Sequence, residues 1–467
     1  MTDGVSLTSR SSTNLCKSPS KGGYGQGVSA ASPPPVHPLP QFAPPCLRIV
    51  VVSIIWRRTV FVTANKGRAL AESSRSRRPH GRTIRCPGGY DAFVPAPLPP
   101  PIAWDGALAA ALSRADLAVG RLAGEGRRFP NPHLFIRSFV RREAVLSSRI
   151  EGTRTTLAEL LAAEAGAPAG ADSADLREVG NYVSALEYAL DRLETLPLSL
   201  RLIREVHERL MRGVRGDTAA PGEFRRSQNW IGPPGCDLND ASYVPPPAGE
   251  LAACLDALER FLHDDGLPPL VHAALAHAQF EAVHPFLDGN GRVGRLLITL
   301  LLAERGLLPS PLLYLSAYFE ATREAYYAHL LAVTRHGAWE DWLIYFLSGV
   351  RTQAEDALAR IELIDSLFES WRADLAGAPS GRVEQVLRLF VESPFWTVGE
   401  IGKKMGVAYT TARRAIDRLE DAGIVSLFGN AKRNRVYCAA AILAALEAPI
   451  AKDADVNEAP SGRVLFG

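Results

Sequence analysis

Apolar residues recur at every third or fourth position through most of the segment between residues 104 and 375. A period near 3.6 residues lines them along one face of a helix, so the pattern predicts a mainly helical, all-α fold. The expected helices are 107–122, 134–150, 175–193, 198–211, 249–263, 269–283, 293–304, 322–336 and 338–370. One segment, 230–247, places Gly, Pro and Asn-Asp turns between two short apolar pieces, which predicts an inserted β-hairpin.

Residues 1–88 have a different composition from the rest. The 467-residue chain has a net charge of +2, yet this segment carries 13 Lys and Arg against two acids. It is rich in Ser, Arg, Pro and Gly, so we expect it to be disordered or an artefact of start-site choice, with a basic tail for nucleic acid or targeting as the alternative. Because the remainder is acidic, its folded part is not expected to coat nucleic acid, although a local basic patch remains open.

Cysteine spacing and hydropathy bear on location. None of the six cysteines forms a CxxC pair, which favours a reduced, cytoplasmic protein without a zinc ribbon or a redox motif. The apolar stretch 49–56 is far shorter than the ~20 residues of a membrane span. About fifty largely polar, Pro-rich residues precede it, which is unlike a secretory signal. We therefore expect no membrane contact.

A second module follows the glycines at 377 and 381. The expected elements are helices 383–391, 397–405 and 409–422 and strands 424–428 and 435–438, with Thr397 and Glu400 forming a capping box. This order predicts a winged helix-turn-helix at 381–440 and a tail at 441–467. Residues of the third helix and the wing that suit DNA phosphates are Thr410, Thr411, Arg413, Arg414, Arg418, Lys432, Arg433 and Arg435. Docking of a protein, or a homodimer contact, is the alternative.

The stretch from His284 to Arg295 carries the most chemical information. Pro285 ends the preceding helix, and Gly289 and Gly291 lie beside the start of the next one, where backbone N–H groups can converge on an anion. Arg292 and Arg295 occupy one face of that first turn, where positive charge opposes the helix dipole by ~0.3–1 kcal/mol each. A bound polyanion would reverse this cost.

Two further side chains complete a set suited to phosphoryl-type transfer. Asp288 is suited to hold Mg²⁺ on phosphate oxygens, and His284 to take a proton from a hydroxyl. The structural alternative is a sharp helix–turn–helix in which Asp288 and Asn290 only cap. His277, Glu281 and His284 fall at i, i+4 and i+7 and would suit zinc, but no further ligand is evident, so we favour a structural role for the first two.

These twelve residues match every position of HPFx(D/E)GNGRxxR, the signature of the Fic family, which the chain resembles over roughly 90–370. The resemblance implies the Fic helical fold, with an N-terminal helical region at 89–160 and a catalytic domain at 161–375. It implies transfer of AMP from ATP to a Ser, Thr or Tyr hydroxyl of a protein, with His284 as general base and Asp288 on Mg²⁺. The nucleotide-binding residues that it implies are Gly289, Asn290, Gly291, Arg292, Val293, Gly294, Arg295, Glu151, Ile231 and Tyr326.

A second motif resembles the inhibitory pattern (S/T)xxxE(G/N) of the same family. Ser147 and Glu151 lie one helical turn apart and Gly152 follows them. The resemblance implies that Glu151 pairs with Arg295 and excludes a productive ATP pose, and that removal of AMP is a second activity. An ordinary exposed Glu is the alternative.

The family resemblance extends to the 230–247 segment, which is similar to the flap that aligns the target by strand addition. Ile231 would line the slot for the target side chain. Tyr326, in preference to Tyr327, would lie on the adenine side. The alternative function is a DNA-binding transcriptional regulator with a nucleotide-sensing Fic domain.

Overall fold

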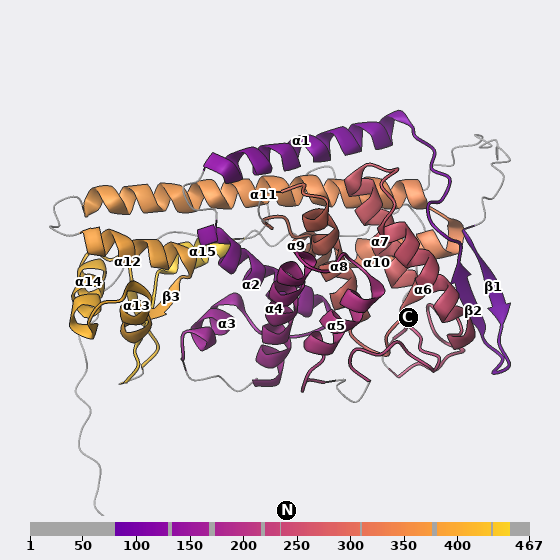
Figure 1. Cartoon of the computed structure of the whole chain (residues 1–467), viewed down its shortest axis with the longest axis horizontal. Coiled ribbons are helices and arrows are strands. Elements are labelled where there is room, and N and C mark those ends of the chain that lie inside the picture. The colour runs from indigo at the N-terminus through magenta and orange to yellow at the C-terminus, as the bar shows by residue number, and fades with distance from the viewer. Residues whose placement is uncertain are drawn as a thin grey trace, which may run out of the picture. The chain divides into compact units, whose positions relative to one another are not determined.

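The structure is a computed structural model that describes residues 80–128, 133–167, 173–215, 220–233, 235–308, 311–375, 381–430 and 433–448. The predictions for residues 1–79, for Lys432 and for most of the 441–467 tail lie outside these residues. Helices dominate the described chain, as predicted (Figure 1). In the part before residue 376 they are α1 (Gly106–Arg128), α2 (His133–Ile150), α3 (Leu157–Glu164), α4 (Ser173–Leu193), α5 (Leu200–Leu210), α6 (Ala248–Leu262), α7 (Pro269–Val283), α8 (Asn290–Glu304), α9 (Ser316–Ala321), α10 (Arg323–His336) and α11 (Trp339–Asp374).

Helix α7 lies at the centre of the main core. Its sequence is apolar on nearly every side, and all but a few of its residues are buried, as expected of a helix enclosed by others. It contacts α6, α8, α10 and α11. The residue that follows α7 is His284, so the candidate catalytic loop begins at the end of a rigid element.

Helix α11 connects the main core to the C-terminal elements. It lies beside α1 over much of its length and also contacts the helices that follow it in sequence (Figure 1). Helix α2 contacts α4 and α9 in the core. At its N-terminal half, the Ser138 hydroxyl donates to the Glu392 carbonyl (3.1 Å) and the Arg137 guanidinium lies 5.6 Å from the Trp396 ring. Helix α2 is therefore anchored in both parts of the molecule.

Order begins earlier than the expected boundary near residue 90. Strands β1 (Gly81–Arg85) and β2 (Asp91–Pro95) form an antiparallel hairpin with Gly81 opposite Pro95 and Arg85 opposite Asp91. The expectation that all of 1–88 is disordered is thus wrong for 81–88. Strand β1 is mostly exposed and has no apolar run, so pairing with β2 and the packing of one side chain, Ile84, account for its order.

The 230–247 segment contains one antiparallel bridge instead of the expected pair of regular strands. Ile231 N donates to Tyr243 O (2.9 Å) and Tyr243 N donates to Ile231 O (3.0 Å). Phe93 N, in β2, donates to Val244 O (2.9 Å), so the terminal hairpin supports the base of this flap. Prolines 245–247 remove further backbone donors, which explains why the pairing stops.

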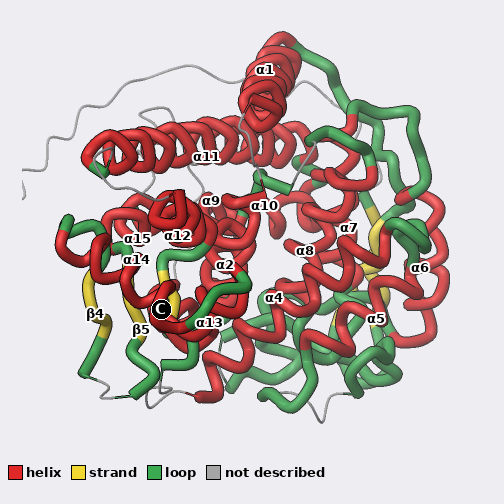
Figure 2. Tube along the Cα trace, turned by 60° about the vertical axis from the view of Figure 1, so that its left-hand side comes forward, coloured by secondary structure: helices red, strands yellow, loops and turns green. Residues whose placement is uncertain are grey.

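The C-terminal elements follow the predicted order and add two that were not predicted. They are α12 (Gly381–Glu392), β3 (Phe395–Thr397), α13 (Val398–Met405), α14 (Tyr409–Asp421), β4 (Ser426–Phe428), β5 (Val436–Cys438) and α15 (Ala440–Glu447). The strands form one antiparallel sheet in the order β3-β5-β4, beside α12 to α14 (Figure 2). Strand β3 and helix α15 were unexpected. The capping box of Thr397 and Glu400 is confirmed.

Helix α15 begins inside the region expected to be a tail. Its Ile442 and Leu446 are buried. The Arg360 guanidinium, on α11, donates to the Ala445 carbonyl (2.5 Å), the Leu446 carbonyl (3.1 Å) and the Ala448 carbonyl (2.7 Å), which satisfies the C-terminal end of α15. The short helices α3 and α9 were also not predicted, because too few turns are present for a period to be read. None of the described helices has the length and hydropathy needed to cross a bilayer.

Candidate active site

The loop between α7 and α8 is shaped by two left-handed residues. His284 has φ 48° and ψ 61°, and Gly289 has φ 78°. Pro285 disfavours a helical His284, as predicted, and Gly289 adopts its conformation without a Cβ penalty. Since Gly289 precedes α8, the N–H groups of Asn290, Gly291 and Arg292 have no partner within the helix. They form a set of donors suited to an anion.

The Asn290 side chain holds the loop together. Its Oδ1 accepts from Phe286 N and its Nδ2 donates to Phe286 O, both at 2.8 Å. The Phe286 ring stacks on His207 at 3.7 Å. Asn290 is 2% exposed, so its side chain is committed to the loop and only its backbone amide is left for a phosphate.

Two residues that precede the flap also hold the α7–α8 loop in place, and neither was assigned this role from the sequence. Arg225 Nε donates to the His284 carbonyl (2.9 Å), and Arg225 N donates to the Pro285 carbonyl (2.9 Å). Asn229 Nδ2 donates to the Phe286 carbonyl (2.8 Å). In the sequence, only the position of these two polar residues just before a turn-rich segment could have suggested that they hold the catalytic loop.

His284 is set up to accept a proton. Its Nδ1 lies 3.3 Å from the Glu281 carbonyl, so Nδ1 carries hydrogen and Nε2 is the basic nitrogen. Burial lowers the pKa of His284 to about 4, with Arg225 contributing in the same direction. The imidazole is therefore neutral at pH 7. Its pKa is lower than the ordinary value near 6.5 that the sequence alone would suggest. Burial also raises the pKa of the neighbouring Glu281 to about 7.

Arg295 is held by α2 at the end predicted to be inhibitory. Its Nη2 lies 2.7 Å from Glu151 Oε1 and 3.0 Å from the Ser147 carbonyl, and its Nε donates to Ser147 Oγ at 2.9 Å. Burial opposes the charged form of Glu151, but Arg295 outweighs it and holds the pKa of Glu151 below its usual range. The predicted Glu151–Arg295 contact is present, and Gly152 follows with φ 98°.

Gly291 is the reason that Glu151 can lie this close to α8. A Cβ at Gly291 would lie 2.5 Å from Glu151 Oε1 and 3.0 Å from Arg295 Nη1. Glu151 thus occupies the space directly against the first turn of α8, beside the unpaired amides. A phosphate bound by those amides and Arg295 would have to take the place of the carboxylate.

Arg292, the other arginine of the first turn, is paired from a different direction. Its Nη1 lies 3.2 Å from Glu178 Oε2, on α4, and its Nη2 lies 4.0 Å from Asp288 Oδ1. Glu178 is 2% exposed and was not singled out from the sequence. Only its position in the apolar period of α4, a helix of 21 residues, could have suggested that it faces inward.

Asp288 lies at the mouth of the loop. Its Oδ1 accepts from Gly289 N at 2.6 Å, its side chain is 48% exposed, and its backbone carbonyl accepts from His207 Nε2 at 3.0 Å. A fixed, half-exposed carboxylate next to a set of amides suits a hard cation bound together with phosphate. The residues present therefore fit Mg²⁺.

The preference for Tyr326 on the adenine side needs correction. Tyr326 is 1% exposed, and its hydroxyl donates to His277 Nε2 at 2.9 Å, whereas Tyr327 is 42% exposed. His277 Nδ1 donates in turn to the Gly294 carbonyl (2.9 Å), so both of its nitrogens are used and it has the structural role expected. Tyr327 is the exposed member of the pair. Ile231 is 39% exposed on the flap, as its expected role requires.

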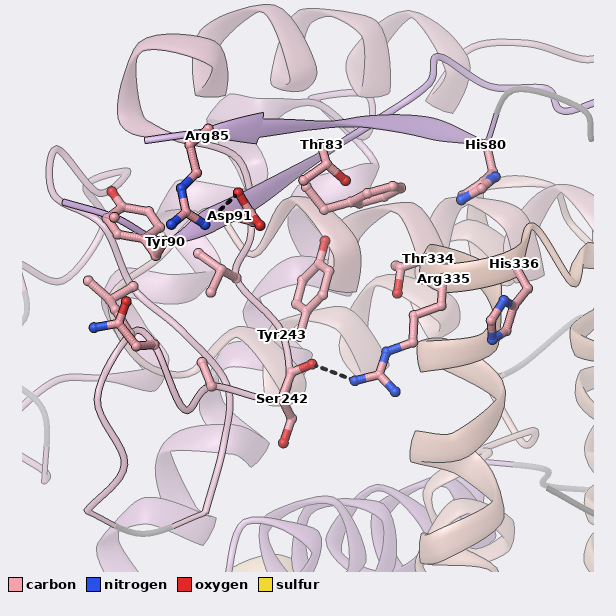
Figure 3. Close-up of a pocket in the computed structure, with 16 residues that line it drawn as sticks. His80, Thr83, Arg85, Tyr90, Asp91, Ser242, Tyr243, Thr334, Arg335 and His336 are labelled. Atoms are coloured by element: carbon pink, nitrogen blue, oxygen red, sulfur yellow. Dashed lines mark hydrogen bonds and ion pairs between the residues drawn. The ribbon is translucent and has the colours of Figure 1, made fainter. Parts of the chain in front are cut away.

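A cavity of about 590 Å³ lies between the β1–β2 hairpin, residues 238–244 of the flap and the end of α10 (Figure 3). Its walls include Arg85, Asp91, Tyr243 and Arg335. None of residues 284–295 lines it. The chemical groups of the loop, and not this cavity, therefore locate the candidate active site at the α7–α8 loop.

Two sequence models match this part of the chain. Residues 109–191 match the one described as Fic/DOC family N-terminal, and residues 197–302 match the one described as Fic/DOC family. The chain carries a Fic domain. The matched ranges include Glu151 and the whole α7–α8 loop, so both motifs lie within them.

Parts of this chain are also similar to curated relatives and to solved structures. The proteins named Protein adenylyltransferase Fic of Drosophila virilis and Drosophila yakuba are each 38% identical over 120 residues, or 25% of this chain and 22% of the relative. The chain thus spans about a fifth of the length of these relatives. A Fic family protein from Desulfovibrio desulfuricans G20 has a TM-score of 0.49 at 20% identity, covering 73% of this chain and 98% of its own. Fic-1 from C. elegans has a TM-score of 0.42 at 22% identity, covering 55% and 74%.

Proposed function

We propose that this Fic chain is a protein adenylyltransferase that transfers AMP from ATP to a Ser, Thr or Tyr hydroxyl of a protein. The observation that carries the proposal is the α7–α8 loop. It brings a neutral imidazole, the unpaired amides of α8 and two buried arginines to one turn. The name of the curated relatives supports the same activity.

The transfer step follows from the residues of the loop. The amides of α8, Arg292 and Arg295 hold the β- and γ-phosphates and stabilise the charge that develops on them. The target hydroxyl oxygen forms a bond to the α-phosphorus, and its proton passes to His284 Nε2. The bond from the α-phosphorus to the bridging oxygen breaks, and pyrophosphate leaves with that electron pair. Mg²⁺, held by Asp288 when bound, would supply charge neutralisation.

We also propose that Glu151 inhibits this reaction in the resting protein. Its carboxylate occupies the first turn of α8 and pairs with Arg295, so ATP must displace it before the γ-phosphate can be held. A charge-assisted Arg–carboxylate contact competes well with Arg–phosphate. Because Arg295 keeps the pKa of Glu151 low, protonation near neutral pH does not open the site.

The flap is the proposed binding element for the target. The flap has one backbone bridge, between Ile231 and Tyr243, and strand addition beside it would read main-chain groups and tolerate many sequences. Ile231, exposed at the bridge, would contact the residue beside the modified hydroxyl.

Incubation with α-³²P-ATP and Mg²⁺ tests the activity directly. We expect weak labelling of protein by wild type, stronger labelling by Glu151→Gly, and none by Glu151→Gly combined with His284→Ala. The β,γ-labelled nucleotide is the matched control and should leave no label on protein, since pyrophosphate departs. Labelling from the γ position, or none from Glu151→Gly, would rule out AMP transfer.

Removal of AMP is the second activity proposed for Glu151. A carboxylate beside the phosphate site is placed to orient a water against an AMP-modified side chain. Protein labelled by Glu151→Gly is the substrate for the test. Wild type should release labelled AMP from it and Glu151→Gln should not; equal release by both would exclude the role.

For the C-terminal elements we propose DNA binding through α14. The alternative function of the chain is then that of a DNA-binding regulator with a nucleotide-sensing Fic domain. Arg414 and Arg418 are exposed one turn apart on α14. Arg413 instead pairs with Asp417 at 2.5 Å and contacts the Tyr437 hydroxyl, so it is not free for a phosphate as expected from sequence. Replacing Arg414 and Arg418 by Ala should weaken salt-dependent binding of a fluorescent duplex, whereas wild type that binds no duplex at 50 mM salt would refute the proposal.

A further inference from the structure

Glu178 supports Arg292 from the side opposite to the solvent-facing loop. The side chains of Glu178 and Arg292 are 3% and 4% exposed, and their closest atoms are 3.2 Å apart. The second carboxylate oxygen of Glu178 lies 3.6 Å from Arg215 Nε, whose side chain is 70% exposed. Arg292 is therefore the main partner of a carboxylate that has almost no water around it.

The Arg292 guanidinium keeps unused donors despite this contact. Its Nη2 contacts Met211 Sδ at 3.6 Å and lies 4.0 Å from Asp288 Oδ1, and its Nε has no hydrogen-bond partner among the described residues. A guanidinium carries five N–H donors, of which Glu178 takes one. A buried donor without a partner is costly unless a ligand or water supplies an acceptor. Of these groups, Nη2 lies 4.0 Å from Asp288 Oδ1, on the loop where the nucleotide phosphates are expected.

We propose that Glu178 is a positioning residue that holds the Arg292 guanidinium in place for the phosphates of ATP. The inference rests on the proposed function for the identity of the ligand. Glu178 does not touch the reacting atoms and acts only through Arg292. Its role is the reverse of that of Glu151, because it fixes an arginine in the binding geometry instead of occupying the phosphate site.

The different burial of the two carboxylates supports this distinction. Glu151 is 33% exposed at the end of α2, where it can move aside into solvent. Glu178 lies within α4, and withdrawing it would leave Arg292 charged and unpaired in the core, which is strongly unfavourable. A nucleotide can displace Glu151, but it has to bind while Glu178 stays in place.

The test compares Glu178→Gln and Glu178→Ala in the Glu151→Gly background, so that the inhibitory contact does not obscure the result. Gln keeps the shape and one acceptor, and Ala removes both. We expect the Kd for Mg·ATP, measured by titration calorimetry, to rise about 10-fold for Gln and more for Ala, because a misplaced phosphate ligand loses most of its contribution. The KM for ATP should rise in parallel, with a smaller change in the KM for the target.

Asn181→Ala is the matched control for packing. Asn181 lies on α4 one turn from Glu178, and its Nδ2 donates to the Leu210 and Arg212 carbonyls, so its loss loosens the packing of the same helix and leaves the Glu178–Arg292 contact itself in place. The thermal midpoint should fall in this variant while the Kd for Mg·ATP stays within about twofold of the Glu151→Gly protein.

Three results would overturn the inference. Activity or affinity that rises in Glu178→Gln would make Glu178 a second inhibitory carboxylate. A lower thermal midpoint with unchanged ATP affinity, as in Asn181→Ala, would make it a packing residue only. If the Glu151→Gly protein binds no Mg·ATP, the inference and the proposed function are both wrong, whereas ATP binding that depends on Glu178 without AMP transfer would overturn the proposed function alone.

Discussion

Both arginines of the first turn of α8 are paired with a glutamate, but the two glutamates lie on different helices and differ in burial. Arg295 is paired with Glu151 at 2.7 Å, and Arg292 is paired with Glu178 at 3.2 Å. The first carboxylate lies at a helix end and is one-third exposed, and the second lies within a helix and is buried. A ligand can replace a carboxylate that is partly exposed to solvent, whereas a buried carboxylate stays paired and holds its arginine in place.

The largest effect expected from this difference is on stability. Arg292→Ala leaves Glu178 charged and enclosed, so we expect a loss of ~3–5 kcal/mol in the free energy of unfolding. Arg295→Ala should cost less, about 1–2 kcal/mol, because Glu151 can turn to water. Urea unfolding followed by circular dichroism measures both. Equal losses would show that exposure does not separate the two pairs.

The second effect is on activity. Glu151→Gly is expected to raise initial rates of labelling about 10-fold or more, since the free energy that ATP spends on displacing the carboxylate, at least ~1.4 kcal/mol, is no longer needed. The conservative Glu151→Gln should give a smaller rise, because the amide still contacts Arg295 but more weakly. A Gln variant more active than the Gly variant would contradict competition for Arg295.

The third effect concerns pH. Arg295 holds the pKa of Glu151 below its usual range, and burial lowers the pKa of His284 to about 4. Both groups therefore keep their pH 7 charge down to pH 5, so the ratio of Glu151→Gly to wild-type rates should change by less than about twofold between these values. In the Gly variant, kcat/KM should decline only as pH approaches about 4. A decline centred near 6.5 would show that His284 is hydrated in solution.

The smallest effect is expected at the outer partner of Glu178. Arg215 is 70% exposed and 3.6 Å from the carboxylate, so Arg215→Ala should change the free energy of unfolding by no more than ~0.5 kcal/mol. ATP affinity should not change. A loss comparable with that of Arg292→Ala would mean that Arg215, and not Arg292, is the partner that matters.

Local patterns were sufficient for many of the elements. The limits of α7 were predicted to the residue, and α4, α10 and the Thr397 cap were placed closely, because each depends on period or on capping within a few residues. Strand β1 and helix α15 were not. Helix α15 depends on a partner distant in sequence, Arg360 of α11, and β1 has no apolar run to read, although Arg82 reaches Glu250 of α6.

The candidate site likewise has features that local sequence predicts and features that depend on the tertiary structure. The types and spacing of His284, Asp288, Arg292 and Arg295 within twelve residues pointed to phosphate chemistry before any fold was known. Exposure did not follow from the pattern, and Tyr326 proved to be enclosed while Tyr327 is open.

The sequence by itself therefore determined the chemistry that the α7–α8 loop offers, because all of its groups lie within a few turns of one another. Only the tertiary structure decided what each arginine faces. Glu151 lies 144 positions from Arg295 and Glu178 lies 114 from Arg292, and no local rule reaches that far. Burial, which depends on how α2 and α4 pack against α8, makes one of these contacts replaceable and the other permanent.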